Sequence, residues 1–330
     1  MNDLGPTLRT EGEHPWIQGT LTDQPMLIIV GGYRCGTTSL FTYLAAHPDI
    51  DPALIKEPAF FFSLRIAQRP SAYPAGHEAW AYRSMFRRRN ARVLLEATSN
   101  YFNDPGCAAR IARALPNARI VVLMREPVAR LVSWYRFLRL QNQLDPGLGF
   151  EAWIRRQLAE TRPVDERPYT LQAVAHCRYA PYLEDYLRVF GRDRVLPLWF
   201  DDFKSDPRGT LRRVCGFAGI DPRFHDGYAF PVQNESMKLR RVGWFRAYRR
   251  LHKGLARVLQ PWPRLQHEFK VQLFGRLEPR LLPFFTAPAD PVDVPDALVR
   301  ELRAHFIADL APLHERVGSP APWQAEYLAP

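Results

Sequence analysis

A short apolar segment near the N-terminus of this chain runs directly into a glycine-containing loop. Residues 26–30 have the apolar character of a buried strand, and residues 31–39 read Gly-Gly-Tyr-Arg-Cys-Gly-Thr-Thr-Ser. Leu40, Tyr43 and Leu44 follow with the spacing of one helix face. A strand that turns at glycines into a helix directs free N–H groups and the positive end of the helix dipole toward the turn. The pattern predicts a phosphate site, and the alternative is an ordinary turn between a strand and a helix.

The loop differs from that of an ATPase or a GTPase at one position. It keeps the Gly-x-x-x-x-Gly spacing from Gly31 to Gly36, but Thr37 stands where those proteins have a lysine. That change removes the usual contact with the β and γ phosphates. Arg34 supplies a permanent planar cation, and the hydroxyl groups of residues 37–39 can donate hydrogen bonds to a 5′-phosphate. The loop therefore predicts a nucleotide without a γ-phosphate.

A second segment of similar design follows farther along the chain. Residues 119–124 have the pattern of a strand, and residues 128–135 have helical periodicity with a proline just before them. Arg125 therefore leaves the carboxyl end of a strand, and Ser133 lies about two turns into the next helix. Because ligands of an open parallel sheet bind at the carboxyl ends of its strands, we expect both segments to face one crevice.

These two segments, in this order, resemble the motifs of the sulfotransferases that use 3′-phosphoadenosine-5′-phosphosulfate (PAPS). Members of that family carry a (Lys/Arg)-x-Gly-Thr-(Thr/Arg) loop for the 5′-phosphosulfate and an Arg-(Asp/Glu)-Pro-x-x-Arg-x-x-Ser-x-(Tyr/Phe) segment for the 3′-phosphate. The matching stretches are residues 34–38 and 125–135. The resemblance implies a P-loop-like fold that binds PAPS and requires no metal. It also implies a phosphosulfate site of Arg34, Cys35, Gly36, Thr37, Thr38 and Ser39, and a 3′-phosphate site of Arg125 and Ser133.

Three further stretches extend the resemblance. Residues 56–61, Lys-Glu-Pro-Ala-Phe-Phe, resemble the Lys-Glu-x-x-Phe-Phe segment of the glycan-sulfating and bacterial branch, in which the glutamate is the proposed catalytic base. Residues 95–102 resemble the Glu-Lys-Thr-Pro-x-Tyr segment of that branch. Residues 234–236 resemble the start of a late basic loop that closes over the nucleotide, and its cations would be Lys238, Arg240 and Arg241.

Two positions depart from the family pattern. Arg34 replaces the lysine of many members and preserves its charge, so we expect catalysis to survive the change. Ala97 occupies the position of a lysine in the heparan-type enzymes, so the acceptor contacts of that branch do not transfer to this chain. The expected acceptor is a hydroxyl group on a carbohydrate, a glycolipid or a small metabolite.

Sulfuryl transfer needs a group that takes the proton of the acceptor hydroxyl. Glu57 is the candidate base, and Arg34 is the cation that would stabilise charge on the leaving phosphate oxygen. Lys56 is a candidate substrate-binding residue that could pair with Glu57, orient it or touch the departing sulfuryl group. Adjacent side chains on an extended segment, however, point to opposite faces. Without the resemblance, Glu57 is interpreted as a solvated loop carboxylate. His47 and His176 are the other candidate bases, and each has a structural or surface alternative.

The order of apolar and amphipathic segments predicts an α/β fold with a central parallel β-sheet and helices on both faces. No repeat or clean linker divides the chain, so we expect a flexible arm over residues 1–24 and a single domain over residues 25–330. Stretches 65–90 and 140–177 interrupt the alternation and are the expected acceptor-binding elements. Strands are predicted near 26–31, 93–97, 119–124 and 194–199, and helices near 37–46, 106–115, 128–142, 150–160, 178–190, 207–218 and 295–317.

Several features bear on the cellular compartment. Residues 1–24 lack the apolar core of a signal peptide, and no run of about eighteen apolar residues supports a transmembrane anchor. The four cysteines are scattered without Cys-x-x-Cys pairs, which argues against zinc and against a disulfide framework. We therefore predict a cytoplasmic enzyme of bacterial type. Cys35 stands beside Arg34 at a helix N-terminus, which predicts a lowered thiol pKa, and the alternative is a small residue that fits the tight loop.

The chain carries 45 basic and 34 acidic residues, and its net charge of +11 exceeds what one nucleotide requires. Residues 236–267 contain nine Lys or Arg and no Asp or Glu. This stretch predicts a basic amphipathic helix. Residues 238–258 are expected to contact an anionic membrane or a lipid-linked acceptor peripherally. The alternative is a helix that packs on the core and whose arginines are solvated. Nucleic-acid binding is disfavoured because no recognition motif accompanies the charge. The apolar residues at helical spacing are Trp244, Tyr248, Leu251, Leu255 and Val258.

Two other functions stay open on the sequence alone. A nucleotide kinase with a degenerate P-loop would depend on ATP and magnesium, and Thr37 in place of the lysine argues against it. A non-catalytic nucleotide-binding or membrane-surface protein would keep the phosphate site without transferring sulfate. The sequence predicts no particular oligomeric state.

Overall fold

The structure is a computed structural model of the 330-residue chain. It describes residues 19–63, 79–88, 90–230, 237–240, 242–259, 262, 264–265, 268–269, 277–288 and 291–329. The strands are β1 (Met26–Gly31), β2 (Ile50–Pro52), β3 (Val93–Ala97), β4 (Ala118–Met124), β5 (Val195–Trp199), β6 (Met237–Leu239) and β7 (Thr286–Pro288). The α-helices are α1 (Thr37–Ala45), α2 (Ala79–Arg83), α3 (Cys107–Ala114), α4 (Pro127–Leu140), α5 (Phe150–Leu158), α6 (Ala173–His176), α7 (Ala180–Phe190), α8 (Phe200–Ser205), α9 (Pro207–Ala218), α10 (Val242–Val258), α12 (Glu278–Phe285), α13 (Asp296–Val317) and α14 (Gln324–Leu328). Short 3-10 helices are η1 (Tyr101–Asn103), η2 (Val164–Glu166), η3 (Tyr169–Leu171), η4 (Arg192–Arg194) and η5 (Phe224–Gly227).

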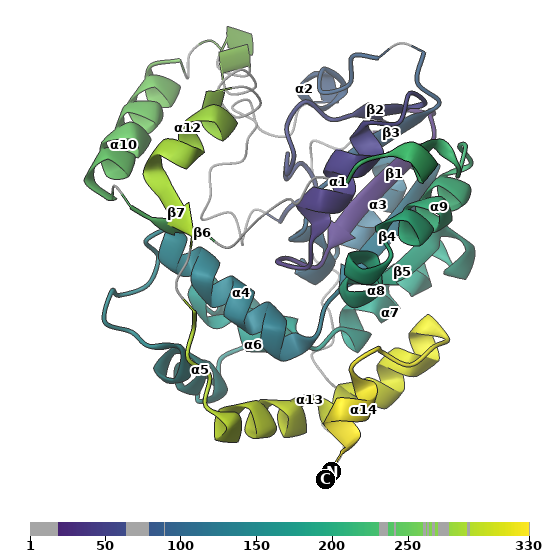
Figure 1. The fold of residues 1–330 in the computed structure, drawn as a ribbon. Helices are drawn as coiled ribbons and strands as arrows, with labels where there is room; N and C mark the ends of the chain where they lie inside the picture. The colour runs from purple at the N-terminus through teal and green to yellow at the C-terminus, as the bar shows by residue number, and fades with distance from the viewer. Residues whose placement is uncertain are drawn as a thin grey trace.

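A parallel sheet of five strands, in the order β2-β3-β1-β4-β5, forms the centre of the molecule (Figure 1). From β1 the chain builds β2 and β3 on one side and then crosses to β4 and β5 on the other. Strands β1 and β4 therefore lie at the switch point, where open α/β sheets bind ligands. The predicted α/β fold is confirmed, and each of the four predicted strands is present within one residue at either end.

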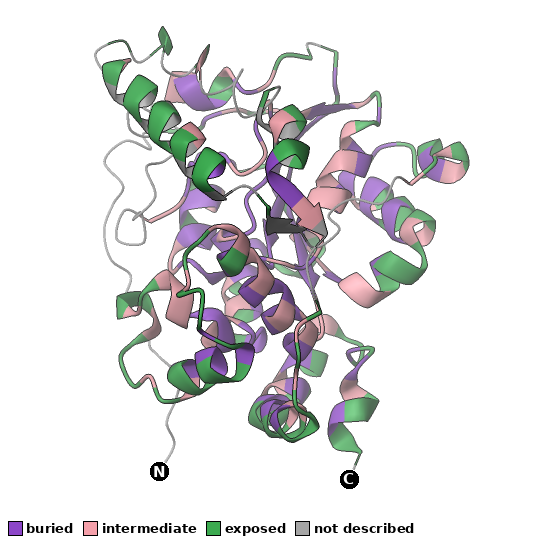
Figure 2. Ribbon diagram, turned by 60° about the vertical axis from the view of Figure 1, so that its left-hand side comes forward, coloured by how far each residue is buried: buried purple, intermediate pink, exposed green. Residues whose placement is uncertain are grey.

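The two faces of the sheet are covered by different helices. Leu27 and Ile29 of β1 pack toward α1 and α9, whereas Met26, Ile28 and Val30 pack toward α3, α4, α7 and α13. All five side chains are buried, which is why this strand is a continuous apolar run rather than an alternating pattern. Figure 2 shows the buried sheet between partly exposed helices.

Every helix that the sequence predicts in the sheet-forming part of the chain is present. Helix α4 begins at Pro127, and the Glu126 side chain caps it by accepting a hydrogen bond from the backbone N–H of Val128 at 3.0 Å. The missed helices α6 and α8 are too short to show a helical period. The missed strand β2 has only three residues, of which one is Asp and one is Pro.

The expected acceptor-binding stretches differ in how far they can be described. Stretch 140–177 contains α5, η2, η3 and α6, and most of stretch 65–90 lies outside the described residues, apart from α2 and its neighbours. The division into an arm (1–24) and one domain (25–330) stays a prediction, because residues 1–18 also lie outside the described part. None of the described helices combines the length and the apolar character needed to cross a membrane.

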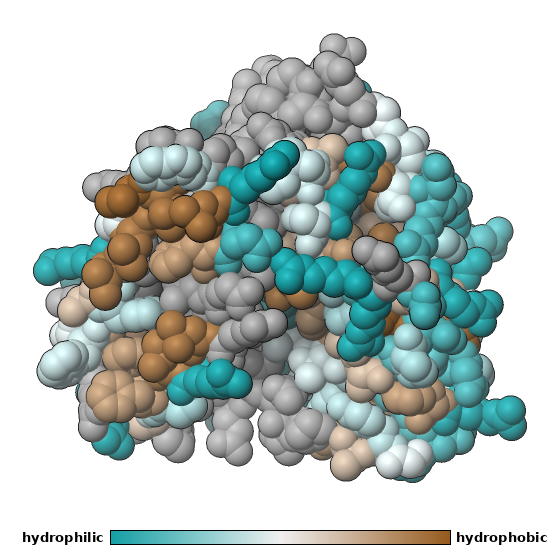
Figure 3. All heavy atoms as spheres, turned by 90° about the horizontal axis from the view of Figure 1, so that it is seen from above, coloured by the Kyte–Doolittle hydropathy of each residue, from teal (hydrophilic) through white to brown (hydrophobic). Residues whose placement is uncertain are grey.

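The predicted basic helix is present as α10, and only part of its apolar stripe is packed against the protein. Phe245 is buried against Phe285 of α12, with 5.8 Å between ring centroids, and Tyr248 stacks on the same ring at 5.7 Å. Seen from above, hydrophobic side chains gather on the side of the molecule where α10 and α12 lie (Figure 3). Helix α10 is therefore attached through Phe245 and through Tyr248 of its apolar stripe. The other four apolar residues of its stripe are exposed, namely Trp244, Leu251, Leu255 and Val258.

Candidate active site

The glycine loop between β1 and α1 makes the sharp turn that its sequence predicts. Gly36 has a positive φ of 86°, and a Cβ atom there would lie 2.6 Å from the ring of Phe200. A Cβ atom on Gly31 would lie 2.4 Å from Cβ of Phe102. Because any side chain would overlap a neighbour, only glycine fits at either position. The two glycines thus let the backbone turn from the strand into the helix against aromatic side chains.

The N-terminus of α1 has the features of an anion site. Its N-cap residue is Gly36, which has no side chain to accept hydrogen bonds from the first turn, and that turn contains no acidic residue. Thr37 is buried, and Thr38 and Ser39 are partly buried beside it. Free N–H groups at the start of a helix bind phosphate and similar anions. The predicted phosphosulfate site therefore has the backbone arrangement that it requires.

The two predicted anion-binding segments meet in the structure. Arg34 Nε donates a hydrogen bond to Ser133 Oγ at 3.3 Å, and Arg125 Nη1 donates one to the backbone oxygen of Arg34 at 3.4 Å. The guanidinium of Arg34 lies over the ring of Phe137, and that of Arg125 lies over the ring of Phe200. Both arginines are partly buried. The carboxyl ends of β1 and β4 thus carry two aromatic-supported cations and a serine hydroxyl in one place.

Arg130, which the sequence analysis did not single out, supports the loop between β1 and α1 through hydrogen bonds. It is fully buried, and its Nε donates a hydrogen bond to the backbone oxygen of Tyr33 at 2.9 Å. Its other nitrogens donate to Asn103 Oδ1 at 3.4 Å and to the backbone oxygen of His176. The sequence did contain an indication of its importance, because Arg130 is the second arginine of the Arg-Glu-Pro-x-x-Arg segment. Its position assigns it to supporting the loop rather than to contacting a ligand.

The predicted lowering of the Cys35 thiol pKa is wrong, and the alternative of a small residue that fits the tight loop agrees with the structure. The side chain is fully buried, and burial raises the pKa of its thiol above the ordinary value, although Arg130, Arg125 and Arg34 all act to lower it. Desolvation outweighs the nearby cations because no water remains to stabilise a thiolate. Its Sγ lies 3.7 Å from the backbone oxygen of Tyr33, so the residue fills space inside the turn. All four cysteines are buried and free of disulfides.

Glu57 lies at the end of the neighbouring strand β3. Its backbone N–H donates to the backbone oxygen of Ala97 at 2.8 Å, and its Oε1 accepts hydrogen bonds from Lys56 Nζ and from Ser99 Oγ, each at 2.7 Å. The Glu57 side chain is 35% exposed, whereas Ser99 is buried. The expected divergence of Lys56 and Glu57 is wrong, because Glu57 has a φ of 63° and is not extended. Ser99 is a second residue that the sequence analysis missed, although it lies within the 95–102 stretch.

The segment that carries Glu57 is fastened to the strand and helix beside it. The backbone N–H of Ala59 donates to Thr98 Oγ1 at 3.3 Å, and that of Phe61 donates to Tyr101 Oη at 3.0 Å. Thr98 in turn donates to Glu96 Oε1 at 3.0 Å, and Glu96 Oε2 accepts from Tyr82 at 2.6 Å. Burial raises the pKa of Glu96. This buried network supports the segment from beneath, so Glu57 sits on a fixed backbone.

Ser99 also connects Glu57 to the glycine loop. The backbone oxygen of Ser99 lies 3.1 Å from the point where a Cβ atom of Gly31 would stand. The backbone N–H of Thr98 donates to the backbone oxygen of Ile29 at 3.1 Å. Glu57 therefore lies beside the carboxyl end of β3, next to the glycine loop that follows the adjacent strand β1.

The sequence also suggested two histidines as bases, and in the structure both are held by neighbouring residues. His47 is buried and is held between the backbone oxygen of Asp221 at 3.1 Å and the backbone N–H of Asp49 at 3.1 Å. His176 packs against Trp134 and Tyr182, and burial lowers its pKa to about 3. A group with so low a pKa is a weak base at neutral pH.

The late basic loop is described only in part. Strand β6 pairs with β7 and packs beside α4, the helix that carries Ser133. Arg240 follows β6 and is exposed, and its backbone N–H donates to the backbone oxygen of Phe285 at 2.8 Å. Lys238 lies within β6, and Arg241 lies outside the described residues. Their proposed contact with the 3′-phosphate stays a prediction.

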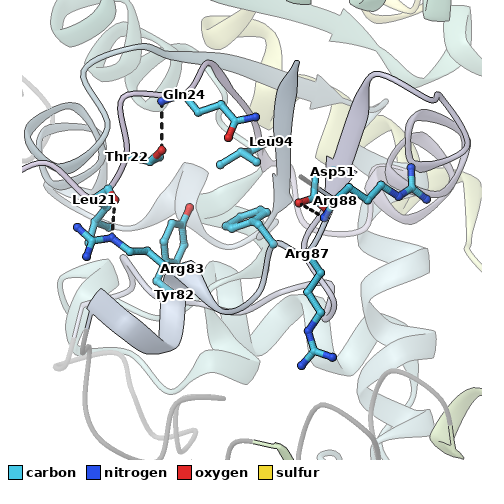
Figure 4. Close-up of a pocket in the computed structure, with 10 residues that line it drawn as sticks. Leu21, Thr22, Gln24, Asp51, Tyr82, Arg83, Arg87, Arg88 and Leu94 are labelled. Atoms are coloured by element: carbon cyan, nitrogen blue, oxygen red, sulfur yellow. Dashed lines mark hydrogen bonds between the residues drawn. The ribbon is translucent and has the colours of Figure 1, made fainter. Parts of the chain in front are cut away.

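A cavity of about 660 Å³ lies away from this edge of the sheet (Figure 4). It is lined in part by Arg83, Arg88 and Leu94, which is near the start of β3. Arg83 Nε donates to the backbone oxygen of Leu21 at 2.7 Å, and Arg88 Nη1 donates to that of Ile50 at 2.8 Å. These arginines are engaged in joining backbone segments. Among the described residues no group of three or more His, Cys, Asp or Glu side chains could hold a metal ion.

Comparisons with known proteins agree with this arrangement. A family model described as the sulfotransferase domain matches residues 24–242. Human heparan sulfate glucosamine 3-O-sulfotransferase 6 is 33% identical over 198 residues, which cover 59% of this chain and 52% of that protein. Human bifunctional heparan sulfate N-deacetylase/N-sulfotransferase 3 is 24% identical over 314 residues, which cover 92% of this chain and 31% of that protein. The chain thus spans about half the length, or less, of these curated relatives.

A solved structure resembles the whole chain. It is a sulfotransferase from Alicyclobacillus acidocaldarius, with a TM-score of 0.63 and 23% sequence identity, and the match covers 93% of this chain and 100% of that one. At this level of identity the likeness concerns the fold. It agrees with the parallel sheet and the flanking helices described above.

Proposed function

The chain belongs to the sulfotransferase domain family, and we propose that it transfers the sulfuryl group of PAPS to a hydroxyl group of an acceptor. The observation that carries the proposal is the meeting of Arg34, Ser133 and Arg125 at the ends of β1 and β4. A PAPS molecule carries two anionic groups, a 5′-phosphosulfate and a 3′-phosphate. Two cationic segments that meet at the ends of β1 and β4 suit such a donor better than a nucleoside triphosphate, for which the loop lacks the lysine.

We assign the binding roles by position. The N–H groups at the start of α1, with Arg34, hold the 5′-phosphosulfate, and Arg125 and Ser133 hold the 3′-phosphate. The partly exposed guanidinium of Arg34 is already oriented by Ser133 and by the ring of Phe137. Because the cation is held in place before the reaction, it can stabilise the charge that develops on the leaving oxygen without reorganising.

The transfer itself is an in-line displacement at sulfur. The acceptor oxygen forms a bond to sulfur while the bond between sulfur and the bridging phosphate oxygen breaks, and the bond electrons stay on that phosphate. Glu57 takes the acceptor proton, while Lys56 and Ser99 hold its Oε1. The products are the sulfated acceptor and adenosine 3′,5′-bisphosphate.

The acceptor class is also a proposal. Curated relatives are named for heparan sulfate, and we infer a carbohydrate or another hydroxyl-bearing acceptor for this chain. The heparan-type lysine is replaced by Ala97, so the acceptor contacts differ from those of that branch. A cytoplasmic location and a bacterial origin stay predictions.

The test is calorimetric titration with adenosine 3′,5′-bisphosphate and, separately, with ATP and magnesium. We expect the bisphosphate to bind and the Arg125→Ala variant to lose at least about tenfold in affinity, because a charge-assisted contact to phosphate is removed. Arg119→Ala is the matched control, since it removes an arginine from the opposite end of β4. A preference for ATP, or equal losses in both variants, would overturn the proposal.

A further inference from the structure

Helix α10 exposes a continuous apolar stripe. Trp244, Leu251, Leu255 and Val258 are between 42% and 70% exposed and follow one another at helical spacing. Trp262 and Leu265, just beyond the helix, are exposed as well. Most of the large apolar side chains that are exposed in the described part of the chain lie between residues 244 and 284. An exposed apolar patch of this kind marks an interaction surface.

Helix α10 joins the protein at one edge of this stripe. Phe245 and Tyr248 fix the helix to Phe285 of α12 through ring contacts. Because Trp244, Leu251, Leu255 and Val258 stay exposed beside these contacts, an external surface can reach them without moving the helix. Figure 2 shows the described part of α10 largely exposed.

The charge around the stripe has one sign. Residues 236–267 contain nine Lys or Arg and no Asp or Glu, and the described side chains of Arg250 and Arg264 are exposed. An apolar stripe on a basic helix is typical of helices that lie at the boundary of anionic headgroups and acyl chains. A second copy of this chain fits less well, because two such stripes face to face would bring together like charges without acidic partners.

We propose that α10 binds the surface of an anionic lipid bilayer, with Trp244, Leu251, Leu255 and Val258 entering the headgroup boundary and the surrounding cations attracting the lipid charge. The four exposed stripe residues differ from the residues that we propose to hold PAPS at the ends of β1 and β4. The protein would therefore act as a peripheral membrane protein whichever acceptor it sulfates.

The test is co-sedimentation of the full chain with vesicles. We expect binding to vesicles of phosphatidylglycerol and phosphatidylcholine, weak binding to phosphatidylcholine alone, and loss of binding at high salt. The triple variant Leu251→Ser, Leu255→Ser, Val258→Ser should bind about tenfold less tightly or worse, since its apolar contact with the interface is lost. The double variant Arg250→Gln, Arg264→Gln should weaken binding by about fivefold for each charge removed.

The matched control is Ile307→Ser with Leu328→Ser, which replaces exposed apolar side chains on α13 and α14. It should bind vesicles as the natural chain does. Bisphosphate titration of every variant checks that the nucleotide site is unchanged. The proposal is overturned if the natural chain does not bind anionic vesicles, if it binds neutral vesicles equally well, or if the triple variant binds undiminished. Conversion of a dimer into a monomer by the triple variant would also overturn it and assign the stripe to self-association.

Discussion

Among single residues, Glu57 is the one whose hydrogen bonds bear most directly on the proposed sulfuryl transfer. Its Oε1 accepts hydrogen bonds from the adjacent Lys56 and from the buried Ser99. In the family pattern of residues 95–102, Ser99 stands in place of proline and Ala97 in place of lysine. This chain therefore orients its candidate base with a hydroxyl group. A donor to a carboxylate favours the charged form, which is the form that accepts a proton.

Replacing Glu57 by Gln should lower kcat for sulfuryl transfer by about a hundredfold or more and leave bisphosphate affinity unchanged, because Gln cannot accept the proton. Ser99→Ala should lower kcat less and move the acidic limb of the pH profile to higher pH, because one donor to the carboxylate is lost. The measurement is the steady-state rate over a range of pH. The control is Ser84→Ala, which removes a hydroxyl group just after α2. Full activity of Glu57→Gln would assign the base elsewhere, or favour a non-catalytic protein.

At the scale of elements, the junction of β1, the glycine loop and α1 provides the backbone of the proposed anion site. The apolar strand is buried on both faces, and the turn that follows is closed by neighbouring aromatic rings. Gly36 combines two constraints, a positive φ and a close approach to Phe200. Gly219, at the C-cap of α9, has the same kind of φ at 76° but no neighbouring atom within 4 Å of a Cβ.

Substitutions at these two glycines distinguish the energetic cost of backbone strain from that of steric overlap. Gly219→Ala should cost about 1 kcal/mol in the free energy of unfolding, because only the left-handed conformation is penalised. Gly36→Ala should cost about 2–4 kcal/mol and weaken bisphosphate binding, because the ring of Phe200 must also move. Urea unfolding and calorimetric titration of both variants provide the comparison. Equal costs in the two variants would show that the contact with Phe200 is unimportant.

The whole molecule is held together by polar contacts between distant parts of the chain. Arg130 of α4 joins the loop after β1 to η1 and α6 through Tyr33, Asn103 and His176. Near the C-terminus, Asp309 of α13 accepts a hydrogen bond from the backbone N–H of Tyr179 at 2.8 Å. These contacts join the loop after β1 to α4 and the start of α7 to α13.

His176 makes the stability of the whole molecule dependent on pH. Burial, with smaller contributions from Arg130 and Arg167, lowers its pKa to about 3, so the unfolded chain takes up a proton below about pH 6.5 while the folded chain does not. The contribution to stability is therefore present above about pH 6.5 and is lost as the pH falls toward 3. His176→Gln should flatten this part of the unfolding profile relative to the natural chain. The natural chain is the reference, and an identical slope in His176→Gln would contradict the assignment.

Local patterns of residues were enough to predict the parallel α/β fold, four strands of its sheet and the family. Which side chains meet depends on the packing of the whole fold. Burial reversed the expected pKa shift of Cys35, and a left-handed backbone at Glu57 brought Lys56 onto its carboxylate. Ser99 and Arg130 acquired their partners across the fold, and the stripe of α10 proved exposed. Local patterns cannot show such results, because burial and contacts arise from residues far apart in the chain.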